Sequence, residues 1–262
     1  GLAHAYALAR RGLRVAVFER GHQAQGASIR NFGMIWPIGQ PSGTMYALAQ
    51  RSRELWLEVL RASGLWHAES GSLHLAYHDD EAAVLREFVE RHGEAYGVEC
   101  LAPAEVLRRF PAVQPEGLKA GLWSPREVGV DPRQVIAELP DWLHRTHRVD
   151  FFFDTTVTGY HLPRIQTTRG TFVARRLILA TGADFRDLAP ESFNESGLVP
   201  VKLQMMRTPA YPEYRIGTMM AAGLTLRHYK AFADCPSLPA RARWFDAAVQ
   251  AYGEHGIHVM AA

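Results

Sequence analysis

The sequence predicts an α/β fold in which a parallel-sheet domain is interleaved with a second, α+β domain built on a mixed sheet. Helical periodicity over residues 2–9 leads through Gly12 into a short valine-rich run, as in one half of a βαβ unit. A helix start at Asp131 and the apolar run RRLILATGAD at 175–184 repeat this pairing of helix and buried strand later in the chain. We assign residues 1–41 and 129–199 to the first domain, and residues 42–128 and 200–262 to the second.

The opening stretch, GLAHAYALARRGLRVAVFER, predicts a helix, a glycine turn and a buried strand that ends in a carboxylate. Glu19 follows Gly1 by 18 residues, close to the spacing of about 20 between the glycines and the acidic residue of a Rossmann-like nucleotide site. We therefore interpret Gly1 as the last glycine of that fingerprint, with its first strand outside the sequence. An ordinary helix and strand of another α/β protein is the competing interpretation.

The intervening residues alternate between loops, helices and strands. Residues 21–41 predict a glycine-rich loop, 42–63 a helix, 71–78 an alternating strand, and 79–92 a second helix. Asp131 followed by proline predicts a helix start, and Pro140 inside that helix predicts a kink or a break. The apolar run RRLILATGAD predicts a further buried strand that ends in a turn of small residues.

Composition excludes several classes of protein. The formal net charge of +2 over 262 residues gives no basis for nucleic-acid binding. Two cysteines form neither a disulfide framework nor a metal cluster, so we expect no metal and a cytoplasmic location. No apolar run approaches the ~18 residues of a membrane span.

The chain resembles the flavin-dependent amine and amino-acid oxidase family, which includes glycine oxidases, sarcosine oxidases and D-amino-acid dehydrogenases. The resemblance rests on the opening stretch, the loop GASIRNFGMIWP, the Val-Asp-Pro helix start and LILATGA, in that order. RNFGMIWP and GLTLRHYKAF are most similar to a subgroup associated with organophosphonate breakdown. The resemblance covers the middle of a family member, and we expect both termini to be truncated.

The resemblance implies FAD as cofactor and assigns residues to its parts. Glu19 would bind the adenosine ribose, and Arg20 and Val157 would lie near the adenine. The remaining candidates line the pyrophosphate (Ala27, Ser28), the isoalloxazine ring (Arg30, Asn31, Phe32, Gly33, Met34) and a second nucleotide-side turn (Ala180, Thr181, Gly182). The alternatives without a cofactor are a polar surface loop for residues 27–34, a solvated surface arginine for Arg20 and a core valine for Val157.

The implied reaction is oxidation of a small primary or secondary amine, either an amino acid or an aminophosphonate. Hydride transfer to flavin N5 gives an imine that hydrolyses, and the electrons pass to oxygen or another acceptor. An acidic substrate needs a cationic clamp, for which the candidates are Lys202, Arg207, Arg227 and Tyr229. We expect 224–232 to be a strand with Arg227 and Tyr229 on one face, although surface charges remain the alternative.

Two further interpretations stay open. Thr225 stands where some relatives carry a lysine for oxygen activation, which argues against strong oxidase activity and leaves a dehydrogenase. Glu19 also suits an NAD-dependent enzyme, and the chain could instead be a non-catalytic nucleotide-binding fragment or subunit. The sequence does not indicate an oligomeric state.

Overall fold

The computed structural model describes residues 1–184, 186–200, 206, 208–209, 211–239 and 260–261. The chain divides into two compact units. Unit 1 comprises Gly1–Phe32, Ser63–Leu65 and Asp131–Arg207, and unit 2 comprises Gly33–Ala62, Trp66–Val130 and Thr208–Ala262. The first change of unit therefore falls after residue 32, inside the loop that we place wholly in the first domain.

Unit 1 begins with helix α1 (Leu2–Ala9) and strand β1 (Ala16–Phe18), which the glycine turn at Gly12 joins. Gly12 has φ +75, a conformation that favours glycine. β1 pairs in parallel with β8 (Asp150–Phe152), in the register Ala16 with Asp150. A parallel pair next to a helix is the arrangement that the opening stretch predicts.

Helix α5 (Pro132–His147) precedes β8, and its start agrees with the sequence. The Asp131 side chain accepts the N–H of Arg133 at 2.9 Å, and proline fills the first turn. Of the kink or break predicted at Pro140, the break does not occur, because the helix continues through Pro140 to His147. α5 packs against α1, because the ring of Tyr6 in α1 lies 5.9 Å from that of Trp142 and 5.2 Å from that of His147.

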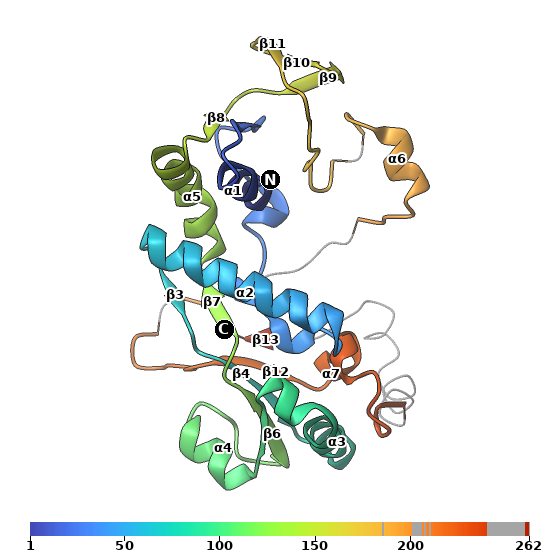
Figure 1. The fold of residues 1–262 in the computed structure, drawn as a ribbon. Coiled ribbons are helices and arrows are strands. Elements are labelled where there is room, and N and C mark those ends of the chain that lie inside the picture. Colours follow the sequence, from blue (N-terminus) through green and yellow to red (C-terminus); the bar gives the residue numbers. More distant parts are fainter. Residues whose placement is uncertain (185, 201–205, 207, 210, 240–259, 262) are drawn as a thin grey trace. The chain divides into compact units, whose positions relative to one another are not determined.

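The remaining strands of unit 1 form a separate antiparallel sheet in the order β11-β10-β9 (Figure 1). Its strands are β9 (Val157–His161), β10 (Arg164–Thr167) and β11 (Gly170–Val173), with the turn at Gly170. Helix α6 (Pro190–Glu195) and short 3-10 turn η1 (Gly26–Ser28) complete the unit.

The expected buried strand over 175–180 is wrong. These residues pair with no strand in the described part of the chain, and the Ile178 side chain is 46% exposed. An apolar run becomes a strand only where a neighbouring strand satisfies its backbone groups, and unit 1 offers none here among the described residues.

Unit 2 contains a five-stranded sheet of order β13-β12-β4-β6-β5, in which only β12 and β4 pair in parallel. Its strands are β4 (Ser72–Ala76), β5 (Glu99–Leu101), β6 (Ala120–Ser124), β12 (Met219–Ala222) and β13 (Met260–Ala261). A smaller sheet of order β2-β7-β3 joins β2 (Met34–Ile35), β7 (Val128–Val130) and β3 (His67–Ala68).

Two apolar layers cover opposite faces of the larger sheet. Helix α3 (Asp79–Tyr96) packs Phe88 and Leu85 with Ala76 and Leu122, all fully buried. Helix α4 (Pro103–Arg109) packs fully buried Val106 on the other face, with Leu73 and Leu75. The long helix α2 (Thr44–Ser63), 3-10 turns η2 (Pro37–Gly39) and η3 (Lys230–Phe232), and helix α7 (Thr225–His228) complete the unit.

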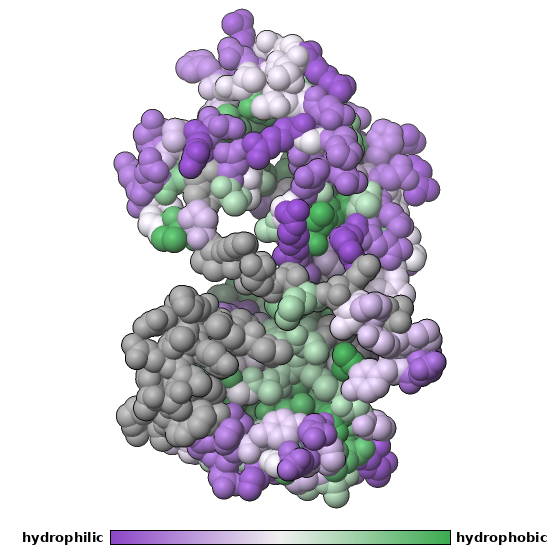
Figure 2. Space-filling view, turned by 180° about the vertical axis from the view of Figure 1, so that it is seen from behind, coloured by the Kyte–Doolittle hydropathy of each residue, from purple (hydrophilic) through white to green (hydrophobic). Residues whose placement is uncertain are grey.

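The two units differ in surface character on the side that Figure 2 shows. Hydrophobic residues gather on the visible face of unit 2, whereas the visible face of unit 1 is mainly hydrophilic. No helix within the described ranges has the length and apolar character needed to cross a membrane.

Candidate functional site

Unit 1 brings the predicted glycine and the predicted second turn together. Gly1 precedes α1, and its carbonyl accepts the N–H of Ala5 at 3.0 Å. A Cβ atom built on Gly1 would lie 4.0 Å from the Cβ of Ala180. Both residues are exposed. Two segments far apart in sequence therefore meet at a surface lined by small side chains, where a ligand can approach the backbone closely.

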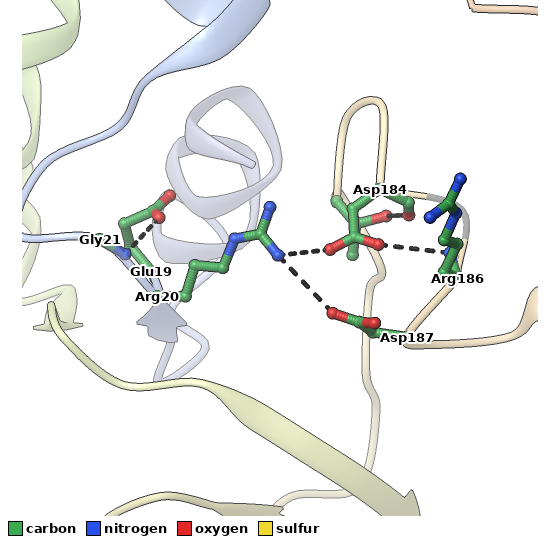
Figure 3. A network of polar contacts seen from close by, with 7 residues as sticks. Glu19, Arg20, Gly21, Asp184, Arg186 and Asp187 are labelled. Carbon is green, nitrogen blue, oxygen red and sulfur yellow. Dashed lines mark hydrogen bonds and ion pairs between the residues drawn. The ribbon is translucent and has the colours of Figure 1, made fainter.

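Glu19 follows the last residue of β1, and its position is fixed by the backbone. Its N–H donates to the carbonyl of Phe152, and its own carbonyl accepts the N–H of Thr155, both at 3.0 Å. The carboxylate Oε1 accepts the N–H of Gly21 at 2.8 Å, which orients the half-buried side chain (Figure 3). The oriented carboxylate is suited to accept ribose hydroxyls.

Arg20 reaches across unit 1 to the turn that follows Ala180. Its Nη1 donates to Oδ2 of Asp184 at 2.6 Å and lies 3.6 Å from Oδ2 of Asp187 (Figure 3). The N–H of Arg186 and then the Arg20 guanidinium hold the pKa of Asp184 below its usual range. Arg20 therefore fastens the strand end to this turn, a role that the sequence did not indicate.

The same turn contains the other two predicted small-residue positions. The hydroxyl of Thr181 donates to the carbonyl of Asp184 at 2.9 Å. Gly182 has φ +65, which favours glycine. The structure thus gathers Gly1, Glu19, Arg20 and the turn in one unit, as a Rossmann-like nucleotide site requires.

The loop predicted to run along the pyrophosphate and the flavin ring is folded back on itself. The Asn31 side-chain amide donates to the carbonyls of Ala27 and Ser28, each at 3.1 Å. Arg30 is exposed, and Phe32 is half-buried.

The end of this loop, from Gly33 on, belongs to unit 2. Gly33 is buried and has φ +67, and its carbonyl accepts the N–H of Val130 at 2.9 Å. Met34 pairs with Gly129 in the smaller sheet. In unit 1, the candidate Val157 opens β9, is half-buried and pairs with Thr167.

The substrate-clamp candidates have mixed outcomes. Lys202 and Arg207 lie outside the described residues. The predicted strand over 224–232 is wrong, because Thr225–His228 form α7 and Lys230–Phe232 form η3. The two helical turns bury adjacent residues, Thr225 with Leu226 and Ala231 with Phe232, which a strand with one exposed face would not give. Arg227 and Tyr229 therefore do not share a strand face.

Tyr229 nevertheless occupies a defined position in unit 2, whereas Arg227 is exposed. The hydroxyl of Tyr229 donates to Sδ of Met260 at 3.6 Å, and its ring lies 6.0 Å from that of Trp36. Burial raises the pKa of the Tyr229 phenol, so the hydroxyl stays protonated.

Sequence reasoning missed two buried polar side chains in unit 2. His74 on β4 is fully buried between the rings of Trp36, at 5.5 Å, and Phe232, at 5.3 Å. Neither of its ring nitrogens has a hydrogen-bond partner among the described residues. Glu127 is fully buried just before β7. The alternation of residues 71–78 places His74 on the face opposite Leu73 and Leu75, and β4 is buried on both faces. Nothing in the sequence around Glu127 indicates burial.

No group of three or more histidine, cysteine, aspartate or glutamate residues in the described ranges could hold a metal ion.

Comparison with known proteins identifies what the chain is similar to. Residues 1–231 match the DAO family, described as FAD dependent oxidoreductase. A glycine oxidase from Geobacillus kaustophilus (strain HTA426) is 29% identical over 227 residues, which are 80% of this chain and 59% of the relative. The chain therefore spans less than two thirds of that protein's length.

Solved structures agree with the family match. The crystal structure of glycine oxidase from Geobacillus kaustophilus has a TM-score of 0.67 at 25% identity, covering 85% of this chain and 63% of the other. The L-proline dehydrogenase from P. horikoshii has a TM-score of 0.70 at 16% identity, covering 100% of this chain and 76% of the other, and so shows likeness of fold.

Proposed function

Because the chain belongs to the FAD-dependent oxidoreductase family, we propose that it oxidises a small primary or secondary amine, either an amino acid or an aminophosphonate. The family match confirms the predicted α/β, Rossmann-like fold class and FAD as the family's cofactor. The family match over residues 1–231 is the observation that carries the proposal. The similarity to a glycine oxidase supports an amine as the substrate class.

The residues of unit 1 fit the adenosine part of this cofactor. A carboxylate held at a strand end suits ribose hydroxyls, and small residues at Gly1 and Ala180 leave room for close approach. The Arg20–Asp184 pair keeps the turn at 181–184 beside this position. When bound, the flavin supplies the hydride-accepting N5 atom.

The protein's own contribution to the chemistry would be binding and orientation. Gly33 and Met34 would support the flavin ring through their backbone, since a buried glycine permits close approach. A cationic side chain would bind the substrate's acid group, and Arg227, Lys202 and Arg207 are the candidates. Exclusion of water would favour the uncharged amine, from which a hydride leaves more readily.

The experiment is flavin reduction without oxygen, followed by absorbance, with a panel of amines. Amino acids and aminophosphonates, each with and without an N-methyl group, are added to the FAD-loaded protein. We expect at least one to bleach the flavin, and phosphonates to do better than carboxylates if the subgroup resemblance holds. Bound flavin that no amine bleaches would contradict the catalytic proposal and favour non-catalytic nucleotide binding.

A further inference from the structure

Glu127 is a buried acid that the proposed chemistry does not use. It lies in the short connection between β6 and β7, and its side chain is completely removed from solvent. Its backbone carbonyl accepts the N–H of Gly71 at 3.0 Å. The next residue, Val128, pairs with Ile35 of β2. Glu127 therefore stands beside the segment that continues the candidate flavin loop.

The carboxyl group of Glu127 joins three separate pieces of unit 2. Its Oε1 accepts the backbone N–H of Ile38 in η2 at 3.1 Å, and its Oε2 accepts the hydroxyl of Ser72 in β4 at 3.1 Å. The hydroxyl of Ser124 in β6 also hydrogen-bonds this group. One side chain thus fixes η2 to two central strands of the sheet.

Burying this carboxyl group costs free energy of folding, so stability alone does not explain its presence. Burial raises the pKa of Glu127, and the groups that lower it again are hydrogen-bond donors, none of them a cation among the described residues. A buried carboxyl without a cationic partner is expensive, and apolar residues of similar size often serve stability as well or better. This cost in stability has a structural reason if the carboxyl group holds a neighbouring backbone segment in place.

The geometry that it fixes is that of residues 33–39. β2 is held by β7 on one side, with Val130 N–H on the Gly33 carbonyl. η2 is tightly packed at Gly39, because a Cβ there would lie 2.5 Å from Cδ1 of Tyr229 and 2.7 Å from Cδ1 of Trp36. The hydrogen bond to Ile38 completes this support at the far end of the segment.

We infer that Glu127 is a positioning residue for the flavin: through Ile38 and β2 it holds Gly33 and Met34 where the isoalloxazine ring would bind. The inference rests on the proposed function. Glu127 does not contact the cofactor itself, and it acts on the cofactor only through the backbone of residues 33–38.

The chain offers a matched control in Glu81. This residue is also buried in unit 2, and its Oε2 accepts the backbone N–H groups of Tyr77, at 2.8 Å, and His78, at 3.1 Å, at the start of α3. Glu81→Gln and Glu127→Gln therefore make the same chemical change at equal burial. Glu81 bonds the backbone before α3, whereas Glu127 bonds η2.

The test compares the two variants with wild-type protein in three measurements: FAD dissociation constant, flavin absorption spectrum, and amide hydrogen exchange of residues 33–40 without cofactor. For Glu127→Gln we expect about tenfold weaker FAD binding, the factor that matches the loss of one hydrogen bond, because the amide keeps only one of the two acceptor oxygens. We also expect a shifted flavin spectrum and faster exchange at the Ile38 amide. Glu81→Gln should change none of these three measurements.

Two outcomes would overturn the inference: unchanged FAD binding and spectrum in Glu127→Gln, or equal weakening in both variants, as a general loss of stability would give. Failure of the proposed function would look different. In that case wild-type protein itself would bind no FAD, and the inferred role toward the flavin would fall with it. Ser72→Ala, which removes a donor but keeps the acid, should weaken FAD binding in the same direction and by less.

Discussion

The buried imidazole of His74 makes a quantitative prediction about acid stability. Burial lowers its pKa to about 3, against an ordinary value near 6.5. The folded protein therefore keeps His74 neutral at mildly acidic pH, while the unfolded chain takes up a proton. A group whose pKa is depressed on folding in this way destabilises the folded state as pH falls below about 6.5.

The magnitude follows from the two pKa values. At about pH 5 the unfolded imidazole is almost fully protonated, which lowers the free energy of unfolding by about 2 kcal/mol relative to about pH 7.5. With a urea dependence of about 2 kcal/mol per molar, this corresponds to a midpoint lower by about 1 M. His74→Leu should lose this part of the pH dependence.

The assay is urea unfolding of wild type, His74→Leu and the control His161→Leu at both pH values. His161 is exposed on β9, so its replacement should leave the pH dependence unchanged. The relevant quantity is the difference between the two pH values within each protein, since this cancels any change in packing. Equal pH dependence in wild type and His74→Leu would refute the reasoning.

Three further outcomes follow from the structure. Gly39→Ala should lower the free energy of unfolding by about 1–3 kcal/mol in thermal unfolding, because the new Cβ would overlap the ring of Tyr229. The control Gly129→Ala should cost under about 0.5 kcal/mol, because a Cβ there would lie 3.9 Å from its nearest neighbour. Similar losses of stability in the two variants would contradict the expected overlap at Gly39. Burial raises the pKa of Glu127, so the contribution of this carboxyl to the free energy of unfolding is fully present below about pH 4.3, the pKa in the unfolded chain, and is lost as pH rises through the raised pKa of the folded state. In urea unfolding, the stability of Glu127→Gln relative to wild type should therefore increase as pH rises to neutral. A stability difference that does not change with pH would contradict the raised pKa. Glu19→Gln should weaken FAD binding about tenfold or more in a fluorescence titration, and unchanged affinity would remove Glu19 from the ribose site.

Local signals account for the parts of the fold that the sequence predicted correctly. Asp131 and the proline after it begin α5 because the carboxylate caps the first turn and proline needs no N–H there. The alternation of residues 71–78 becomes β4 because one face meets α3 and the other meets α4. Each signal is contained within a few neighbouring residues.

The wrong predictions depend on partners that are distant in sequence. Residues 224–232 have a composition that suits either a short helix or a strand, and the burial of adjacent residues, Thr225 with Leu226 and Ala231 with Phe232, goes with the helical turns. The apolar run at 175–180 has no strand to pair with among the described residues, so hydrophobicity alone misled the prediction.

The candidate site likewise contains residues that a local pattern indicates and contacts that depend on the folded chain. Glu19 could be named as a candidate because its distance from Gly1 is a property of the sequence. The contact of Arg20 with Asp184 joins residues 164 positions apart, and that of Glu127 with Ile38 joins residues 89 positions apart. Such pairs arise only from the folded topology, and no local pattern could indicate them.

The measurement that tests the account most directly is the visible absorption of the purified protein after incubation with FAD and removal of unbound cofactor. The account predicts the two broad bands of a protein-bound flavin, at about one FAD per chain, which lose intensity when a suitable amine is added without oxygen. A protein that stays colourless with excess FAD, in a fold shown to be intact by circular dichroism, would contradict it.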